Sequence, residues 1–200
     1  EWKDVLHEGP VTVTEDLATL SEARAAHIAS LGWSDPESAQ REFRERDQKL
    51  HDAGRYHRIV LWFEHDLYDQ LQLIQLLDWF WHQPALQSRL YLINHNEYLG
   101  VIAKQELSEL IGSEKPVTRQ QLNTARLAWQ AFTSPTPEQL LSVYLDDTKA
   151  LPYLHDAMGR LLQFLPSPDN GLARSEQQVL RCVTAGITAP DNLFEAFQRA

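Results

Sequence analysis

The sequence predicts an α/β fold, with a parallel Rossmann-like sheet in the first half and a helical C-terminal part that ends in a helix-turn-helix-like pair. Two short, continuous apolar runs, Ile59–Phe63 and Leu90–Asn94, have the composition of strands that are buried on both faces of a sheet. The segment between them has the apolar spacing of a helix, so strand, helix and strand together have the size of one βαβ unit. After Gly100 the strand signals fade and helical spacing prevails.

The residues before the first apolar run predict an extended segment and two helices. Residues 1–14 suit short extended pieces around a turn, and helical spacing then runs from Leu17 to Gly32. A second helix is expected over residues 35–53, because Pro36 suits the first turn of a helix. Its charged side chains have the mixed signs and the spacing that are typical of a solvent-exposed face: Arg41, Glu42, Arg44, Glu45, Arg46 and Asp47.

The helix between the two predicted strands is expected over residues 66–82. Its apolar side chains form two adjacent rows, so it is predicted to bury a broad face, and Pro84 lies just beyond its end. Crossovers between parallel strands are almost always right-handed, so this one is expected to be right-handed too.

The second half of the chain predicts helices whose boundaries are marked by prolines. The expected helices cover residues 107–111, 119–132, 137–145, 151–165, 175–184 and 188–198. Thr118 with Gln121 has the spacing of a capping box, and Ser175 and Thr188 are expected to cap the last two helices. We therefore predict an α/β domain over residues 1–112, which lacks an upstream first strand, and a helical domain over residues 113–200.

The composition indicates an acidic globular chain. It has 200 residues, of which 43% are hydrophobic, and a net charge of −10. A packed core is therefore expected, whereas nucleic acid and anionic membranes are disfavoured as partners. No apolar run approaches the roughly 18 residues needed to cross a bilayer. The single cysteine, Cys182, excludes a disulfide within these residues and a cysteine-based zinc site, so we expect a protein of the reducing cytoplasm.

The strongest candidate for function is the run that leads from the first predicted strand into the following helix. In open parallel sheets, ligands bind beyond the carboxyl ends of the strands, where Glu64, His65 and Asp66 fall. Asp69 and Gln70 follow one helical turn later, so they are expected on the same rim. We predict catalytic roles for the first three residues if the protein is an enzyme, and ligand binding by the last two.

Two kinds of chemistry suit this run. A histidine between carboxylates can transfer protons near neutral pH, which makes His65 the proton-transfer candidate. A histidine with two or three carboxylates can also hold a divalent metal ion. The alternative is structural, because Asp66 suits a helix N-cap, Asp69 lies where an acid favours the helix dipole, and His65 can pair with a carboxylate.

The same run argues against several common sites. Phosphate cradles need glycine between strand and helix, and none lies between Trp62 and Gln75. Acids at a helix N-terminus repel phosphate unless a metal intervenes, so a dinucleotide site of the Rossmann type is disfavoured. The sequence contains neither the G-x-S-x-G elbow of hydrolases nor the H-E-x-x-H pattern of zinc proteases.

Two further segments are predicted to contribute to ligand binding. His95 and Glu97 follow the second strand, and parallel strands end at the same edge of a sheet. An ordinary polar loop is the alternative explanation for this segment. Glu8 lies in the N-terminal turn, which a first strand upstream of Glu1 would bring to the same face.

The last two predicted helices have the length of a helix-turn-helix pair. A version that binds DNA needs a basic second helix. The charges of this region balance instead, with Arg174, Arg181 and Arg199 against Glu176, Asp191 and Glu195. Packing against the α/β domain or a protein partner is therefore favoured over DNA binding.

A longer pattern resembles a known family. Residues 62–73 resemble the W-F-E-H-D-L-Y-D-Q-L-Q-L signature block of a bacterial family of conserved proteins with a domain of unknown function. Residues 6–10, 46–47 and 171–176 are similar to other segments of that family, so the resemblance spans most of the chain. Members begin upstream with a strand, and usually have Ser or Thr where Ala173 stands. The resemblance implies a location for the site and no established activity.

Two hypotheses follow from the sequence. In the first, a cytoplasmic α/β protein binds a small polar ligand around residues 64–70, with or without a divalent metal. In the second, a regulatory or scaffolding module engages a protein, or DNA, through its C-terminal helices, and the central run only organises the fold. The sequence does not decide whether the protein is an enzyme, nor its oligomeric state.

Overall fold

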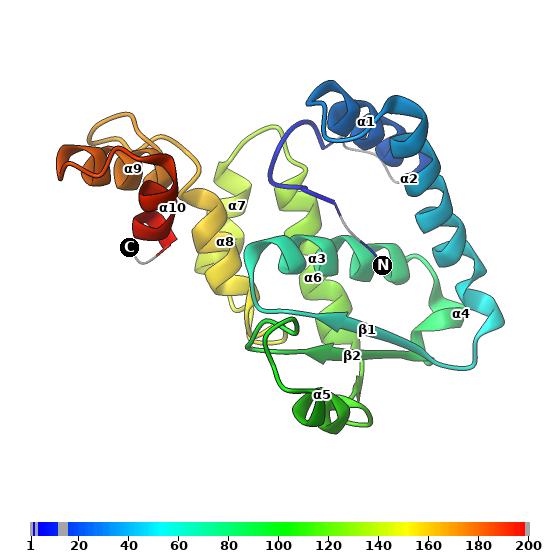
Figure 1. Cartoon of the computed structure of the whole chain (residues 1–200). Helices are drawn as coiled ribbons and strands as arrows, with labels where there is room; N and C mark the ends of the chain where they lie inside the picture. The colour runs from blue at the N-terminus through cyan, green and yellow to red at the C-terminus, as the bar shows by residue number, and fades with distance from the viewer. Residues whose placement is uncertain (1, 3, 12–15, 199–200) are drawn as a thin grey trace. The chain divides into compact units, whose positions relative to one another are not determined.

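A computed structural model describes residues 2, 4–11 and 16–198 of the chain (Figure 1). The fold is a mostly helical α/β arrangement with a small three-stranded mixed sheet in the first half and helices in the C-terminal part. The chain forms two compact units, Glu1–Met158 and Gly159–Ala200, which we describe separately. The predicted domain boundary after residue 112 stays a prediction. None of the helices within the described residues combines the length and apolar character that crossing a bilayer requires.

The sheet consists of β1 (Ile59–Phe63), β2 (Leu90–Asn94) and β3 (Lys115–Pro116), in the order β1-β2-β3. β1 and β2 are parallel, with Ile59 opposite Leu90 and Phe63 opposite Asn94, so both predicted strands are confirmed. β3 is antiparallel to β2, which makes the sheet mixed and not wholly parallel as predicted. Its two residues are too few to leave a periodic signal in the sequence.

The crossover between β1 and β2 is α3 (Leu67–Trp81), which lies over one face of the sheet (Figure 1), followed by the short α4 (Pro84–Gln87). α3 also packs against α6 (Arg119–Phe132), and this contact is the centre of the core. The fully buried apolar side chains of α3 are Leu71, Leu73, Ile74, Leu77 and Phe80. Each contributes on the order of 1.5–3 kcal/mol through burial, so α3 is the element around which unit 1 is organised.

Two paired helices precede the sheet, α1 (Leu17–Ser30) and α2 (Pro36–His51), followed by the 3-10 turn η1 (Asp52–Arg55). The side chains of Asp16 and Asp35 cap their first turns by accepting backbone N–H groups. The prediction that the charged face of α2 is wholly solvent-exposed is wrong at two positions, because Arg46 and Asp47 are buried. Both take part in a buried ion-pair network with α1 and the N-terminal segment.

The remaining helices of the chain are shorter. They are α5 (Lys104–Leu110), α7 (Glu138–Leu145), α8 (Leu154–Leu162), α9 (Arg174–Thr184) and α10 (Pro190–Gln198). The predicted capping box of α6 is confirmed, since the Thr118 side chain accepts the Gln121 N–H and the Gln121 side chain accepts the Thr118 N–H. The predicted cap of α9 is wrong, because Ser175 lies inside the helix and Ala173 is the N-cap residue. Thr188 likewise lies outside the first turn of α10, which begins at Pro190.

Candidate functional site

The candidate site lies where β1 and β2 end. β1 ends at Phe63 and α3 begins at Leu67, so Glu64, His65 and Asp66 form the connecting loop. The N–H of His95 donates to the carbonyl of Phe63 at 2.9 Å, which keeps the loops that follow the two strands side by side. The parallel pairing therefore brings both polar loops to one edge of the sheet.

Two of the acids in this loop region hold the start of α3. Asp66 is the N-cap residue, and its side chain accepts the N–H of Asp69 at 2.9 Å. The Asp69 carboxylate accepts the N–H of Glu64 at 2.6 Å and so closes the loop. Burial raises the pKa of Asp69, the bond from Glu64 N–H opposes that rise, and the negative charges of Asp66 and Glu64 add to it. Both acids thus have a structural task in the loop.

Gln70 connects the ends of the two strands. Its side chain is fully buried, and its Nε2 donates to the carbonyl of Glu64 at 2.6 Å and to Oδ1 of Asn94 at 3.0 Å. A backbone carbonyl can only accept, so these bonds fix the orientation of both amide groups. Within the described residues, Oε1 of Gln70 and Nδ2 of Asn94 are then left buried without a hydrogen-bond partner.

The Glu64 side chain binds the loop that follows β2. Its Oε1 accepts the N–H of Leu99 at 2.8 Å, which ties the loop after β2 to the loop after β1. Tyr98 lies beside this bond, and the pKa of its phenol is raised by desolvation and by the negative charges of Asp66 and Glu64. A half-exposed phenol therefore stays protonated at the rim and remains a hydrogen-bond donor.

The His65 ring lies beside two other aromatic rings. The centroid of its ring is 5.1 Å from that of Tyr98 and 6.1 Å from that of Tyr153, which precedes α8. Its Nδ1 is buried and has no hydrogen-bond partner among the residues that the structure describes. This environment holds the ring in place and leaves one nitrogen available for a proton or a ligand atom.

The other predicted site residues lie at the margins. The ring Nδ1 of His95 accepts the N–H of Glu97 at 3.1 Å, so these two residues form a local turn. Glu8 is exposed, 3.5 Å from the ring of its neighbour His7. The His7 and Tyr68 rings meet edge-on, with their centroids 4.5 Å apart. This contact places the N-terminal turn beside the first turn of α3.

Sequence reasoning missed three side chains of this edge. Asn94 could have been found, because it is a polar residue at the last position of an otherwise apolar strand. Tyr98 and Tyr153 carry no comparable signal, since their proximity to His65 depends on loops that no periodicity describes.

A metal site finds no support in the side chains. Over residues 2, 4–11 and 16–198, no group of three or more His, Cys, Asp and Glu side chains has the arrangement needed to hold a metal ion. Glu64, Asp66 and Asp69 are close in sequence, but each accepts a backbone N–H from the two loops or from the first turn of α3.

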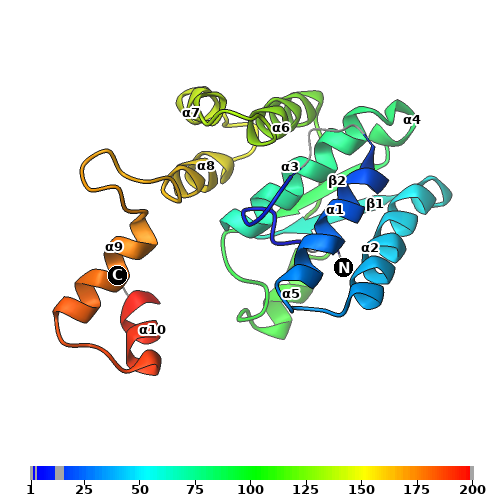
Figure 2. The same cartoon turned by 90° about the horizontal axis from the view of Figure 1, so that it is seen from above.

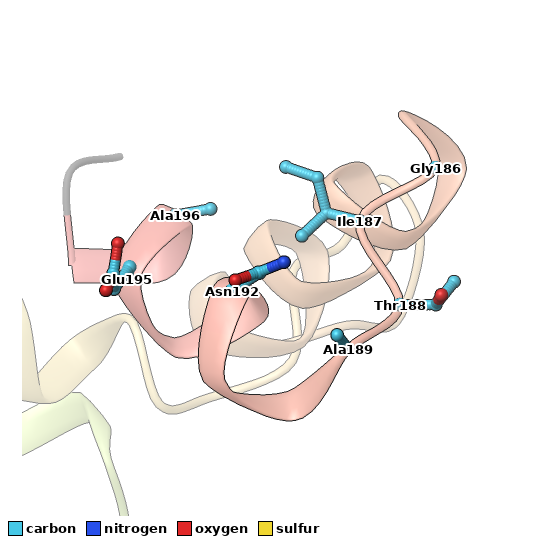
Figure 3. Close-up of a pocket in the computed structure, with 7 residues that line it drawn as sticks. All are labelled: Gly186, Ile187, Thr188, Ala189, Asn192, Glu195 and Ala196. Atoms are coloured by element: carbon cyan, nitrogen blue, oxygen red, sulfur yellow. The ribbon is translucent and has the colours of Figure 1, made fainter.

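Unit 2 contains a separate hollow at the start of α10 (Figure 3). It has a volume of about 560 Å³ and is lined by Gly186, Ile187, Thr188, Ala189, Asn192, Glu195 and Ala196. Most of these side chains are small or apolar, and Glu195 is the one ionisable group among them. The hollow therefore offers less chemistry than the edge of the sheet.

No protein-family model matches the chain, and neither a curated protein nor a solved structure matches it with significance. The family resemblance drawn from residues 62–73 accordingly stays a prediction.

Proposed function

We propose that this protein binds a small polar ligand at the carboxyl ends of β1 and β2. The observation that carries the proposal is a set of three buried polar atoms that lack a hydrogen-bond partner among the described residues: His65 Nδ1, Gln70 Oε1 and Asn94 Nδ2. Buried polar atoms in native proteins nearly always have a partner, in the protein, in water or in a ligand. Three such atoms at the end of two parallel strands favour a bound molecule.

The proposed fold relationship supports this location. β1, α3 and β2 form one βαβ unit, the building block of a Rossmann-like sheet, in which ligands bind beyond the strand ends. We propose that an upstream strand extends this sheet, as in the family that residues 62–73 resemble. Glu8, His95 and Glu97 would then form the outer part of the same site.

The charges of the site define the chemistry of its ligand. Glu64, Asp66 and Asp69 place carboxylates at the mouth of α3, and no glycine exposes backbone N–H groups for a phosphate. The proposed ligand is therefore neutral or cationic. If the protein is an enzyme, His65 transfers the proton, because Asp66 and Asp69 are already engaged by backbone N–H groups.

A thermal-shift screen tests this proposal. We would screen the chain against divalent metal ions, nucleotides, and neutral and cationic metabolites such as sugars and amino acids. A ligand that binds at the strand ends raises the melting temperature of the wild type and fails to raise that of His65→Ala. His57→Ala, which changes an exposed histidine elsewhere in unit 1, is the matched control and should retain the shift. A shift of the same size in His65→Ala would contradict the proposed site.

A second candidate function rests on unit 2. An apolar groove of about 680 Å³ lies between α9 and α10, and Leu180 and Phe194 in it are strongly exposed. Such a surface suits a regulatory or scaffolding module that engages a protein through a helix-turn-helix-like pair. The charges of this region of the sequence, three arginines against three acids over residues 172–200, disfavour DNA.

Fluorescence anisotropy tests the DNA version of this alternative. Labelled double-stranded DNA of random sequence should show no binding to the chain at low salt, where phosphate contacts are strongest. Salt-dependent binding that is lost on Arg181→Ala would instead favour DNA recognition by the pair.

A further inference from the structure

Unit 1 contains a cleft of about 730 Å³ that is distinct from the strand-end site. It lies between the N-terminal segment, the α1–α2 pair and α3, and Figures 1 and 2 show that segment running between the helices. None of Glu64, His65 and Gln70 lines it. Its volume falls in the range of roughly 300–1,000 Å³ that is typical of small-molecule sites.

One wall of this cleft contains Arg46, whose guanidinium is fixed in place by neighbouring side chains. The Arg46 guanidinium lies over the rings of Trp2 and Phe43, at 4.1 Å and 4.4 Å from their centroids. Its Nε donates to Asp47 at 3.1 Å, and its Nη2 donates to Ser21 at 2.8 Å. The side chain is only 6% exposed, and its Nη1 has no hydrogen-bond partner among the described residues.

The carboxylate of Asp4 does not satisfy this amino group. Asp4 lies 4.0 Å from Nη1 of Arg46, beyond hydrogen-bond distance. Its two oxygens are instead held by Nε and Nη2 of Arg24, which is fully buried in α1. Arg24 also donates to the carbonyls of Val5, Glu8 and Pro10, so the N-terminal segment is fixed in place. The cluster therefore holds Arg46 still while leaving one end of it unused.

A second polar atom without a partner comes from α3. Gln72 also lines the cleft and is 5% exposed, and its Oε1 has no hydrogen-bond partner among the described residues. An unsatisfied buried polar group costs on the order of 1–3 kcal/mol. One donor and one acceptor thus stand unpaired in residues that line the same cleft.

The mouth of the cleft is aromatic and carries no excess of positive charge. Trp33 and Tyr68 line it with side chains that are 53% and 48% exposed, and aromatic faces of this kind stack on planar ligands. The charged groups that line the cleft are Asp4, Glu42, Glu45, Arg46 and Lys49. Because three of these five are acidic, the cleft disfavours phosphates and other strong anions.

We propose that this cleft binds a small, neutral, planar molecule that carries a carbonyl oxygen beside an N–H group, as in an amide or a lactam. The carbonyl accepts from Nη1 of Arg46, the N–H donates to Oε1 of Gln72, and the ring stacks on Trp33. Neither polar atom is open to solvent, so the ligand binds by displacing the side chains that cover Nη1 of Arg46, which stays in place, and by a rotation of the Gln72 amide. The ligand thereby supplies the hydrogen-bond partners that these two atoms lack among the described residues.

Isothermal titration calorimetry on the whole chain tests this proposal with two probes. Uridine offers a ring carbonyl beside an N–H, and nicotinamide offers a primary amide on a planar ring. Their matched controls are 3-methyluridine and N,N-dimethylnicotinamide, which keep the carbonyl and the ring but lack the N–H. We expect at least one probe to bind and its methylated control to bind about tenfold more weakly, the effect of one lost hydrogen bond of roughly 1.4 kcal/mol.

Four variants locate the binding. Gln72→Leu removes the acceptor, and Trp33→Ala removes an exposed ring without touching the core, so each should weaken binding about tenfold. Tyr56→Ala changes another exposed ring that lies outside the cleft, and His65→Ala changes the strand-end site. Both should bind as the wild type does.

Three results would overturn the proposal. The first is that neither probe binds at millimolar concentration. The second is that a probe and its methylated control bind equally well. The third is that His65→Ala loses binding of the probe while Trp33→Ala retains it. The last would place the probe at the strand ends, so this cleft and the proposed function fail separately.

Discussion

Asp69 both holds the strand-end loop through a hydrogen bond and has a raised pKa. Its carboxylate is partly buried and accepts the N–H of Glu64, while the carboxylates of Asp66 and Glu64 lie close by. The pKa of Asp69 is raised because burial disfavours the charged form more than the backbone hydrogen bond favours it. An acid with a raised folded pKa stabilises the fold fully below its unfolded pKa, and this contribution is lost as pH rises through the folded value.

Asp69→Asn should therefore raise the melting temperature at neutral pH. The amide keeps an oxygen for the Glu64 N–H but removes the buried negative charge. The gain should disappear as the pH falls below 3.8, the ordinary pKa of the group, because the carboxyl is then neutral in both folded and unfolded chains. Calorimetric melts over a pH series measure this. Asp146→Asn, an exposed carboxylate that also accepts a backbone N–H, should show no such gain.

Arg24, unlike Asp69, has a buried charge that is fully compensated, because all three of its side-chain nitrogens donate hydrogen bonds. Arg24→Met should reduce the free energy of unfolding by about 3–5 kcal/mol, because it leaves Asp4 buried without its main ion-pair partner. The double variant Asp4→Leu/Arg24→Met leaves neither of these charges behind and should lose less. Urea denaturation measures both values, and equal losses in the two variants would show that the unpaired charge is not the cause.

At the scale of elements, the helix starts differ in how well they are capped. Asp16, Asp35, Asp66 and Thr118 each accept a backbone N–H at the first turn of a helix. Ala173 occupies the same position in α9 but has no side-chain acceptor, and only the return bond from Ala173 N–H to Glu176 is made. The resemblance drawn from the sequence predicts Ser or Thr here, and the N-cap position gives that difference a physical meaning.

Ala173→Ser should stabilise α9 by about 0.5–2 kcal/mol, because the new hydroxyl completes the capping box with Glu176. Amide hydrogen exchange within Arg174–Thr184 should slow accordingly, which reports on the helix even if the rest of the chain is unchanged. Ala185→Ser, at the C-terminal end of the same helix, is the control. Unchanged exchange in Ala173→Ser would mean that α9 is not limited by its first turn.

At the scale of the whole molecule, burial is distributed unevenly between the two units. The fully buried side chains concentrate in α3 and its neighbours in unit 1. Among the described residues of unit 2, Leu161 is the one buried side chain, and it lies in α8. Because buried apolar area supplies most of the free energy of folding, resistance to local opening should follow the same distribution.

Hydrogen exchange followed by mass spectrometry should therefore rank the elements. Peptides from α3 should exchange last, near the rate of global unfolding, and peptides from α9 and α10 should exchange first. A partner that covers the groove at Leu180 and Phe194 would reverse the order for unit 2. Equal protection of α3 and α9 in the purified chain would contradict this ranking.

The sequence by itself determined the local elements of this protein. The apolar runs gave both long strands at the observed bounds, and the helix between them within one residue at each end. The cap of α6 and the start of α2 at Pro36 also followed from residue types at fixed spacing. These features depend on neighbours within one helical turn or one strand, so a single sequence contains the information.

Only the tertiary structure decided which residues meet. It joined Gln70 to Asn94, placed Tyr153 beside His65, and buried Arg46 where charge spacing predicted solvent. Each of these outcomes depends on a partner that is distant in the sequence. The energy of a polar contact also depends on how completely that partner excludes water from the polar group. The run that the sequence singled out thus keeps its place at the strand ends, while its unpaired atoms, and those of a second cleft, became visible only once the chain had packed.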